Sequence, residues 1–220
     1  MPQVSKNHYE FNNYLQIPRW TSYWHQIDEV LKIKPKNVLV IGDGDGVISA
    51  VLRNFLEYPS DEKIVFTFDF DKDLNPDFHG DVREIQQIMA GVRVDCILCC
   101  QVLEHIEYKH VNNVLEQFKQ ISNHVVISLP YSHKVLLRAS LKLPKCKYRS
   151  FCLHIPTFYR KYSFNGEHYW ELGTRQVSQK KIIKLLSDYF EIKKKYHVSE
   201  NIYHVFFILE TKGFKEGRNK

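Results

Sequence analysis

The feature that most constrains the fold is an apolar run that leads directly into three closely spaced glycines. Residues 38–41, Val-Leu-Val-Ile, have the composition of a short buried strand, and Gly42, Gly44 and Gly46 follow before a helical pattern begins. Glycines let the backbone turn tightly and let a ligand approach without contacting a Cβ atom. The segment favours a strand–loop–helix unit of an α/β sheet, although a tight turn that binds no ligand would have the same pattern.

Strand-like and helix-like segments alternate along the rest of the chain. Strands are expected at 63–69, 94–100 and 124–130, and helices at 46–58, 83–89, 107–122 and through Ile182–Tyr189. Two further strand runs, 191–198 and 203–210, are close enough in sequence to pair as an antiparallel hairpin. We therefore predict an α/β fold with a Rossmann-like, seven-stranded, mostly parallel sheet, flanked by helices and ending in this hairpin.

The chain length and its N-terminal part suggest a single domain. The 220 residues are enough for one large domain and too few for two, so residues 1–220 are expected to form one unit. Trp20, Trp24, Ile27 and Leu31 recur at helical spacing, which predicts an amphipathic helix over residues 18–34 before the core. In the helix after the glycines, Val47, Val51 and Phe55 are expected to face inward.

Apolar runs and cysteines limit the class of protein. No apolar run approaches the ~20 residues of a membrane span, and the N-terminus lacks a secretory signal, so a cytoplasmic location is expected. The five cysteines are odd in number and irregular in spacing, which argues against a disulfide framework. Cys96, Cys99 and Cys100 lie in an apolar run and are interpreted as small buried side chains, and no metal site is expected.

Acidic residues follow at the positions where Rossmann-type folds hold a ribose. Asp69 ends the second strand, 23 residues after Gly46, and a carboxylate there accepts hydrogen bonds from ribose hydroxyls. Asp71, two residues on, is the competing candidate, and both could merely solvate a loop. Asp81 and Val82 begin the segment after this strand.

The strand 94–100 also ends in polar residues. Cys100 and Gln101 stand at its carboxyl end, where open α/β sheets place ligands. Together, the motifs VLVIGDGDG, FTFD, GDV and QVLEH resemble the class I S-adenosyl-L-methionine (SAM)-dependent methyltransferases, in particular the methyltransferase type 11 group. The resemblance spans residues 36–130 and continues into SLPYS and GEHYWELG.

This resemblance implies methyl transfer with SAM as the cofactor. The glycine loop would hold its methionine part, Asp69 its ribose and Asp81 with the Val82 backbone its adenine, and QVLEH would lie beside the sulfonium. The implied cofactor-binding residues are Gly42, Asp43, Gly44, Asp45, Gly46, Asp69, Asp81, Val82, Cys100 and Gln101.

One position departs from the family pattern. The family usually has an acid two residues before the first glycine, where it helps to hold the methionine ammonium, and this chain has Val40. Asp43 and Asp45 are the two possible substitutes. The alternative function is a scaffold, SAM-binding or with a degenerate site, that acts through its basic surface on a membrane or on RNA. VLVIGDGDG also resembles the spermidine synthase loop, but those aminopropyltransferases carry an acidic motif where this chain has Cys99-Cys100-Gln101, so that function ranks lower.

Methyl transfer from a sulfonium needs positioning and desolvation above all, because the leaving group is already excellent. A general base is required only if the acceptor carries a proton, and the candidates are His105, Tyr131, His168 and Tyr169. His105 could equally pack beside the helix 107–122, and Glu104 could simply favour the start of that helix. His168 lies in a polar-aromatic cluster, EHYW, that suits an acceptor pocket.

A basic insertion separates the last parallel strand from the final helix. Residues 131–165 contain eight Lys or Arg and no Asp or Glu. We predict a mobile, helical lid that attracts an anionic group on a small-molecule or glycan acceptor. The same mixture of basic and apolar residues would suit an anionic membrane surface or a merely solvated segment. No standard nucleic-acid motif is present, so nucleic acid is not the expected partner.

Overall fold

A seven-stranded sheet, in the order β3-β2-β1-β4-β5-β9-β8, runs through the centre of the computed structural model. The structure describes residues 15–60, 62–142, 145 and 149–213. The strands of this sheet are β1 (Val38–Ile41), β2 (Val65–Asp69), β3 (Phe78–His79), β4 (Val94–Cys100), β5 (Ser122–Pro130), β8 (Phe190–His197) and β9 (His204–Thr211).

Strand directions confirm the predicted sheet. β1 pairs in parallel with both β2 and β4, β2 with β3, and β4 with β5. β9 runs antiparallel to both β5 and β8, so the C-terminal hairpin closes one edge. All four residues of β1 are buried, as expected for a central parallel strand covered on both faces.

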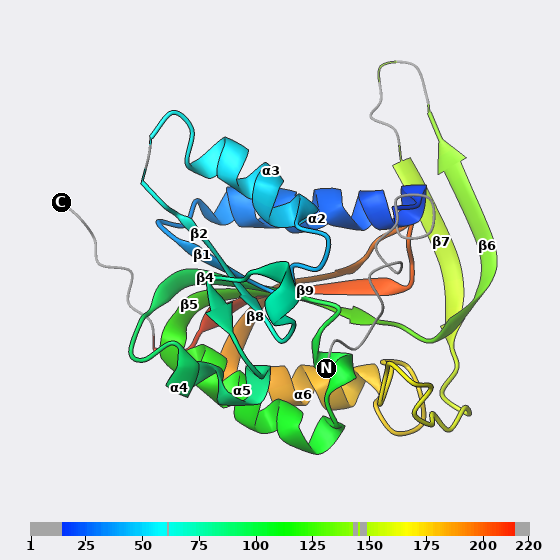
Figure 1. Cartoon of the computed structure of the whole chain (residues 1–220). Helices are drawn as coiled ribbons and strands as arrows, with labels where there is room; N and C mark the ends of the chain where they lie inside the picture. The colour runs from blue at the N-terminus through cyan, green and yellow to red at the C-terminus, as the bar shows by residue number, and fades with distance from the viewer. Residues whose placement is uncertain (1–14, 61, 143–144, 146–148, 214–220) are drawn as a thin grey trace.

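Helices cover both faces of the sheet (Figure 1). α2 (Ile17–Ile33) and α3 (Val47–Leu56) lie on one face, and α4 (Ile85–Ile88), α5 (Tyr108–Ile121) and α6 (Gln179–Tyr189) lie on the other. Short 3-10 turns, η2 (Lys72–Leu74), η3 (Val82–Glu84) and η4 (Leu103–His105), follow β2, β3 and β4. None of the helices in the described part of the chain is long and apolar enough to cross a bilayer.

The prediction of which residues face inward was partly wrong for the first two helices. Trp20 and Trp24 are 54% and 58% exposed, and Phe55 in α3 is also exposed. The buried face of α2 instead includes Glu29, which accepts hydrogen bonds from the Tyr196 hydroxyl (3.0 Å) and from Lys194 in β8. Polar residues can occupy this face because the sheet supplies their hydrogen-bond partners. The spacing of apolar residues in the sequence does not reveal such partners.

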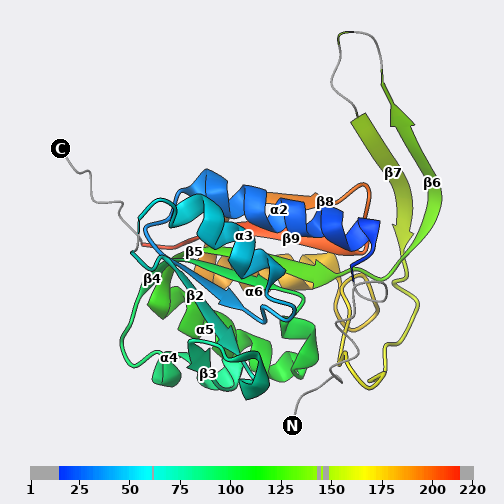
Figure 2. The same cartoon turned by 45° about the horizontal axis from the view of Figure 1, so that its top comes forward.

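The basic insertion forms a β-hairpin, so the prediction of a helical lid was wrong. β6 (His133–Leu141) pairs antiparallel with β7 (Arg149–Pro156) and projects from one end of the domain (Figure 2). A bulge between Val135 and Leu137 interrupts the alternation that would have marked β6 as a strand. Residues 143–144 and 146–148 of the insertion lie outside the described residues.

Candidate functional site

A cleft of about 880 Å³ opens where the strand order of the sheet reverses, beyond the carboxyl ends of β1 and β4. Ligands of open α/β sheets bind at this switch point, because the connections leave it on opposite faces. The glycine loop, the ends of β2 and β4 and the start of α2 line one part of the cleft. Residues 105–107, 167–169 and 203–204 line the other part.

The glycine loop brings backbone close to its neighbours. Gly42 has φ +71°, and a Cβ atom there would lie 2.5 Å from Val102 Cγ2. Asp43 lines the cleft and accepts a hydrogen bond from the Ser49 amide (3.2 Å), while burial raises the pKa of its carboxyl. Asp45 does not line the cleft, since it accepts hydrogen bonds from the Tyr23 hydroxyl (3.1 Å) and the Val47 amide (3.2 Å). Of the two predicted substitutes for an acid at position 40, only Asp43 lies in the cleft.

Asp69 ends β2 and lines the cleft beside this loop. Its Oδ1 accepts a hydrogen bond from the Asp71 amide (2.9 Å). Burial raises the pKa of Asp69, although the backbone amides of Asp71 and Gly44 oppose the shift. Asp71 also lines the cleft, but its own Oδ1 accepts the Asp73 amide (3.0 Å) at the start of η2.

Gly44, Asp81, Val82, Cys100 and Gln101 also line the cleft, whereas the predicted Gly46 does not. Asp81 caps η3 by accepting the Arg83 amide (2.9 Å), and the Arg83 guanidinium holds the pKa of this carboxyl below its usual range. The buried Val82 lines the cleft beside it. Cys100 and Gln101 also line it, and burial raises the pKa of Cys100 to about 12, so this thiol stays protonated. Gln101 has φ +57°, an unusual conformation for a residue with a side chain.

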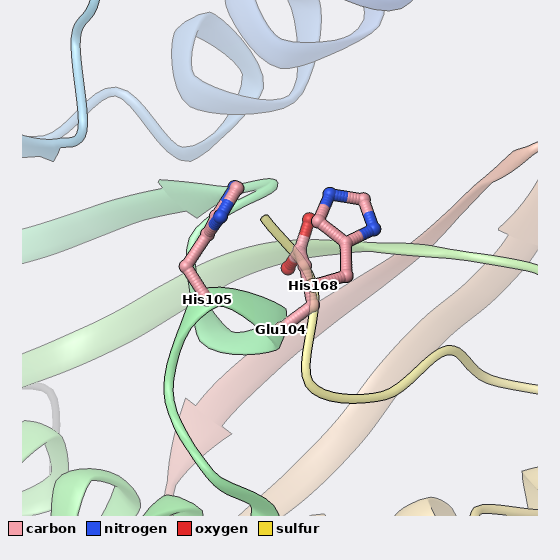
Figure 3. Close-up of side chains that lie close together, drawn as sticks. All are labelled: Glu104, His105 and His168. Carbon is pink, nitrogen blue, oxygen red and sulfur yellow. The ribbon is translucent and has the colours of Figure 1, made fainter. Parts of the chain in front are cut away.

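Three titratable side chains converge at the other part of the cleft. Glu104 and His105 come from η4 after β4, and His168 comes from the loop before α6 (Figure 3). The two imidazole rings meet edge to face with their centroids 4.8 Å apart. One ligand atom from each of the three residues lies within 4.8 Å of the other two. Sequence reasoning selected both histidines but read Glu104 only as a helix-start residue.

Glu104 is fully buried, and neither carboxylate oxygen has a hydrogen-bond partner among the residues that the structure describes. Burial raises its pKa to about 7, and the proximity of His168 acts against this shift. Burial and His168 lower the pKa of His105, while the Glu167 carbonyl oxygen, 3.1 Å from its Nδ1, opposes the shift. The pKa of His168 is raised in spite of burial, because the carboxylates of Glu171 and Glu104 favour its charged form.

Hydrogen bonds fix the segment that carries His168 against the loop after β4. The Tyr169 amide donates to the Glu104 carbonyl oxygen (2.8 Å), and the Trp170 indole donates to the Ile106 carbonyl oxygen (3.0 Å). Behind His168, the Tyr203 hydroxyl donates to Glu171 (2.8 Å), whose Oε1 lies 3.6 Å from His168 Nδ1. These contacts explain how residues more than sixty positions apart form one wall.

Tyr131 donates its backbone N–H to the Tyr203 carbonyl oxygen (2.7 Å), but its side chain packs elsewhere. It is buried and packs against His133, His154 and His197, with ring centroids 4.6–5.6 Å away, and it does not line the cleft. Among the described residues of 131–165, none lines the cleft either. The structure therefore brings together His105 and His168 but neither Tyr131 nor the basic hairpin.

Comparison with known proteins relates this architecture to solved structures. The PH0226 protein of Pyrococcus horikoshii OT3 is 13% identical, with a TM-score of 0.56 over 96% of this chain and 97% of that one. The magnesium protoporphyrin IX methyltransferase of Synechocystis PCC 6803, with bound S-adenosylhomocysteine (SAH), is 12% identical, with a TM-score of 0.56 over 96% of this chain and 90% of that one. The glycopeptide N-methyltransferase MtfA, also complexed with SAH, is 11% identical, with a TM-score of 0.53 over 85% of this chain and 88% of that one.

These likenesses establish the fold. No protein-family model matches the sequence, and no curated protein matches it. The type 11 subgroup is therefore not confirmed. The chain has the Rossmann-like fold of class I SAM-dependent methyltransferases.

Proposed function

We propose that this protein is a SAM-dependent methyltransferase that acts on a small-molecule or glycan acceptor. The observation that carries the proposal is the cleft at the switch point, where Gly42, Asp43 and Asp69 lie together. The methyltransferases with this fold that were solved with SAH support it. Both the glycine loop and the acid at the end of β2 are features that nucleotide-type ligands require.

The residues present fit SAM. At Gly42 a Cβ atom would collide with Val102, so the loop depends on the absence of a side chain there. Asp43 is the acid available for the methionine ammonium, and Asp69 the acceptor for ribose hydroxyls. Because the Asp81 carboxylate is occupied by Arg83, the backbone at Val82 is left to face the adenine. When bound, SAM supplies a methyl group activated by a sulfonium.

The chain itself supplies the positioning on which this chemistry depends. We assign His105 and His168 to the acceptor side, because they line the cleft opposite the glycine loop. Trp170 and Glu171, both buried, hold the segment that carries His168 in place. Tyr131 does not line the cleft and is not included in the proposed machinery.

Calorimetry with three ligands tests the proposal and separates it from both alternatives. We expect SAM and SAH to bind at one site per chain. An aminopropyltransferase would instead prefer decarboxylated SAM, and a scaffold that has lost the site would bind none of the three. Either of these last two results would contradict methyl transfer.

The basic hairpin supports a second property, binding to a membrane surface. Phe151 and Leu153 are 53% and 55% exposed and lie on the same face of β7, together with Ile155. In β6, Leu137 is the residue that pairs with Leu153. The surrounding segment carries eight positive charges and no acid. We infer that this apolar face rests on an anionic lipid surface, since charge attraction and apolar burial would act together there.

Vesicle sedimentation tests this second property. The protein should bind phosphatidylcholine vesicles that contain phosphatidylserine, and not vesicles of phosphatidylcholine alone. F151S together with L153S should weaken this binding, as should replacing Arg138, Lys142 and Arg149 with Ser. If the apolar variant changes the oligomeric state and leaves vesicle binding intact, the face is a contact between chains. If the charge variant raises the acceptor KM and leaves vesicle binding intact, the hairpin serves the acceptor. Either result would overturn the lipid assignment.

A further inference from the structure

Glu104 is a buried carboxylate for which the described residues provide no hydrogen bond. Its side chain has no exposed surface, and both of its oxygens lack a partner among these residues. Among the ionisable groups around it, a charged His168 compensates a negative charge on Glu104 and Glu171 opposes one. A buried, unpaired carboxylate is costly, so such a group usually has a ligand that completes its surroundings.

Each of the two histidines beside Glu104 has an oxygen acceptor near its Nδ1. His105 Nδ1 lies 3.1 Å from the Glu167 carbonyl oxygen, which can only accept, so this nitrogen carries the proton. His168 Nδ1 faces the Glu171 carboxylate at 3.6 Å, which favours a proton on Nδ1 there as well. In both rings Nε2 remains as the lone-pair donor. Metal-binding histidines are typically oriented by a carbonyl or carboxylate behind the ring in this manner.

We propose that Glu104, His105 and His168 bind a divalent transition-metal cation. One ligand atom from each residue lies within 4.8 Å of the others, and rotation of the side chains toward a common centre would bring them to bonding distance. Figure 3 shows the three side chains gathered at one place, from η4 and from the loop that precedes α6. Two imidazoles and one carboxylate suit Zn²⁺, Mn²⁺ or Fe²⁺ better than they suit Ca²⁺.

The open side of this site faces the cleft. His105 and His168 both line it, whereas Glu104 lies behind them. A cation held by three protein ligands keeps positions for an oxygen or nitrogen of a further molecule. We assign these positions to the heteroatom of the methyl acceptor. This role rests on the proposed function, but the cation site itself does not.

Titration of the metal-free full-length protein with Co²⁺ tests the site, since the visible absorption of Co²⁺ reports its ligands. We expect one equivalent to bind. E104Q and H168Q should each weaken binding at least ~10-fold, because each removes a direct ligand. H154Q is the matched control: it removes an imidazole of the separate cluster around Tyr131 and should leave affinity unchanged.

Thermal unfolding of the same proteins guards against a variant that simply fails to fold. Without metal, E104Q should be at least as stable as the parent, because it removes a buried charge that has no hydrogen-bond partner. Added Co²⁺ should raise the Tm of the parent and of H154Q, and not that of E104Q. The proposal is overturned if the parent binds no Co²⁺, if E104Q and H168Q bind it as tightly as the parent, or if thiolate charge-transfer bands show cysteine ligands.

SAH binding, measured on the same samples, separates this proposal from the proposed function. SAH binding without Co²⁺ binding would support the methyl donor site and contradict the cation site. Co²⁺ binding without SAH binding would support the cation site and contradict the proposed methyl transfer.

Discussion

Replacing Asp69 with Asn removes the charged acceptor of the proposed cofactor site and keeps the local backbone contact. Asn retains an oxygen that can accept the Asp71 amide, the hydrogen bond that Asp69 Oδ1 makes at 2.9 Å. It loses the negative charge and presents an amide donor where a ribose hydroxyl needs an acceptor. Because burial already raises the pKa of Asp69, removing its charge should not lower the stability of the fold.

The expected cost follows from the hydrogen bonds that the carboxylate would make. Leaving ribose hydroxyls without their charged acceptor should cost about 1–3 kcal/mol, which weakens SAH binding about 5-fold to 150-fold. Calorimetry with SAH at neutral pH measures this directly. In the parent, affinity should decline on acidification at a higher pH than an exposed Asp would produce, because the raised pKa brings protonation earlier.

Asp71→Asn is the matched control for this measurement. Asp71 lines the same cleft, and Asn can still accept the Asp73 amide at the start of η2. We expect its SAH affinity to stay within about twofold of the parent, a change of under 1 kcal/mol. If Asp71→Asn loses binding while Asp69→Asn retains it, the ribose contact has been assigned to the wrong carboxylate. If neither variant changes affinity, the acid at the end of β2 does not contact the ligand.

Three further predictions concern the loop, the helix–sheet contact and pH. In urea unfolding, Gly42→Ala should lower the free energy of unfolding by about 1–2 kcal/mol from the left-handed backbone alone, and by more because the added Cβ would contact Val102. Gly46→Ala should show only the backbone cost, because Gly46 has φ +75° and no atom lies within 4 Å of the added Cβ. Tyr196→Phe should cost about 1–3 kcal/mol, because it removes the hydroxyl that donates to the buried Glu29; an unchanged urea midpoint would contradict this. Burial lowers the pKa of His204 to about 3, so its contribution to stability is complete above its unfolded value of 6.5 and is lost as pH falls toward 3. His204→Gln should remove a slope of about 1.4 kcal/mol per pH unit in that window, and an equal slope in both proteins would refute the assignment.

The interior of the sheet was predictable because local sequence and burial agree there. Val38–Ile41 is apolar throughout and lies between β2 and β4, so no alternative register could place these residues in water. The two C-terminal strands were predictable for a related reason, since their short separation favours pairing with each other. In α2 the same reasoning failed for Trp20 and Trp24, because the buried face of this helix instead includes Glu29, whose partners Lys194 and Tyr196 lie in β8.

The same distinction applies to the cleft, part of which was predictable from the sequence and part of which was not. The sequence alone determined the part built from local segments. The turn at Gly42, the acid at Asp69 and the residue Gln101 all stand at or just after the carboxyl end of a strand, and a parallel sheet must bring such ends to one edge. Only the tertiary structure decided that Asp43 faces the cleft while Asp45 bonds Tyr23, and that Tyr131 packs among histidines instead of reaching an acceptor. It also placed His168 beside Glu104 and His105, because that contact depends on a long loop folding back to hydrogen-bond the segment after β4. Spacing in a sequence specifies neighbours along a helix or a strand, but contacts between distant loops arise from packing that no local pattern encodes.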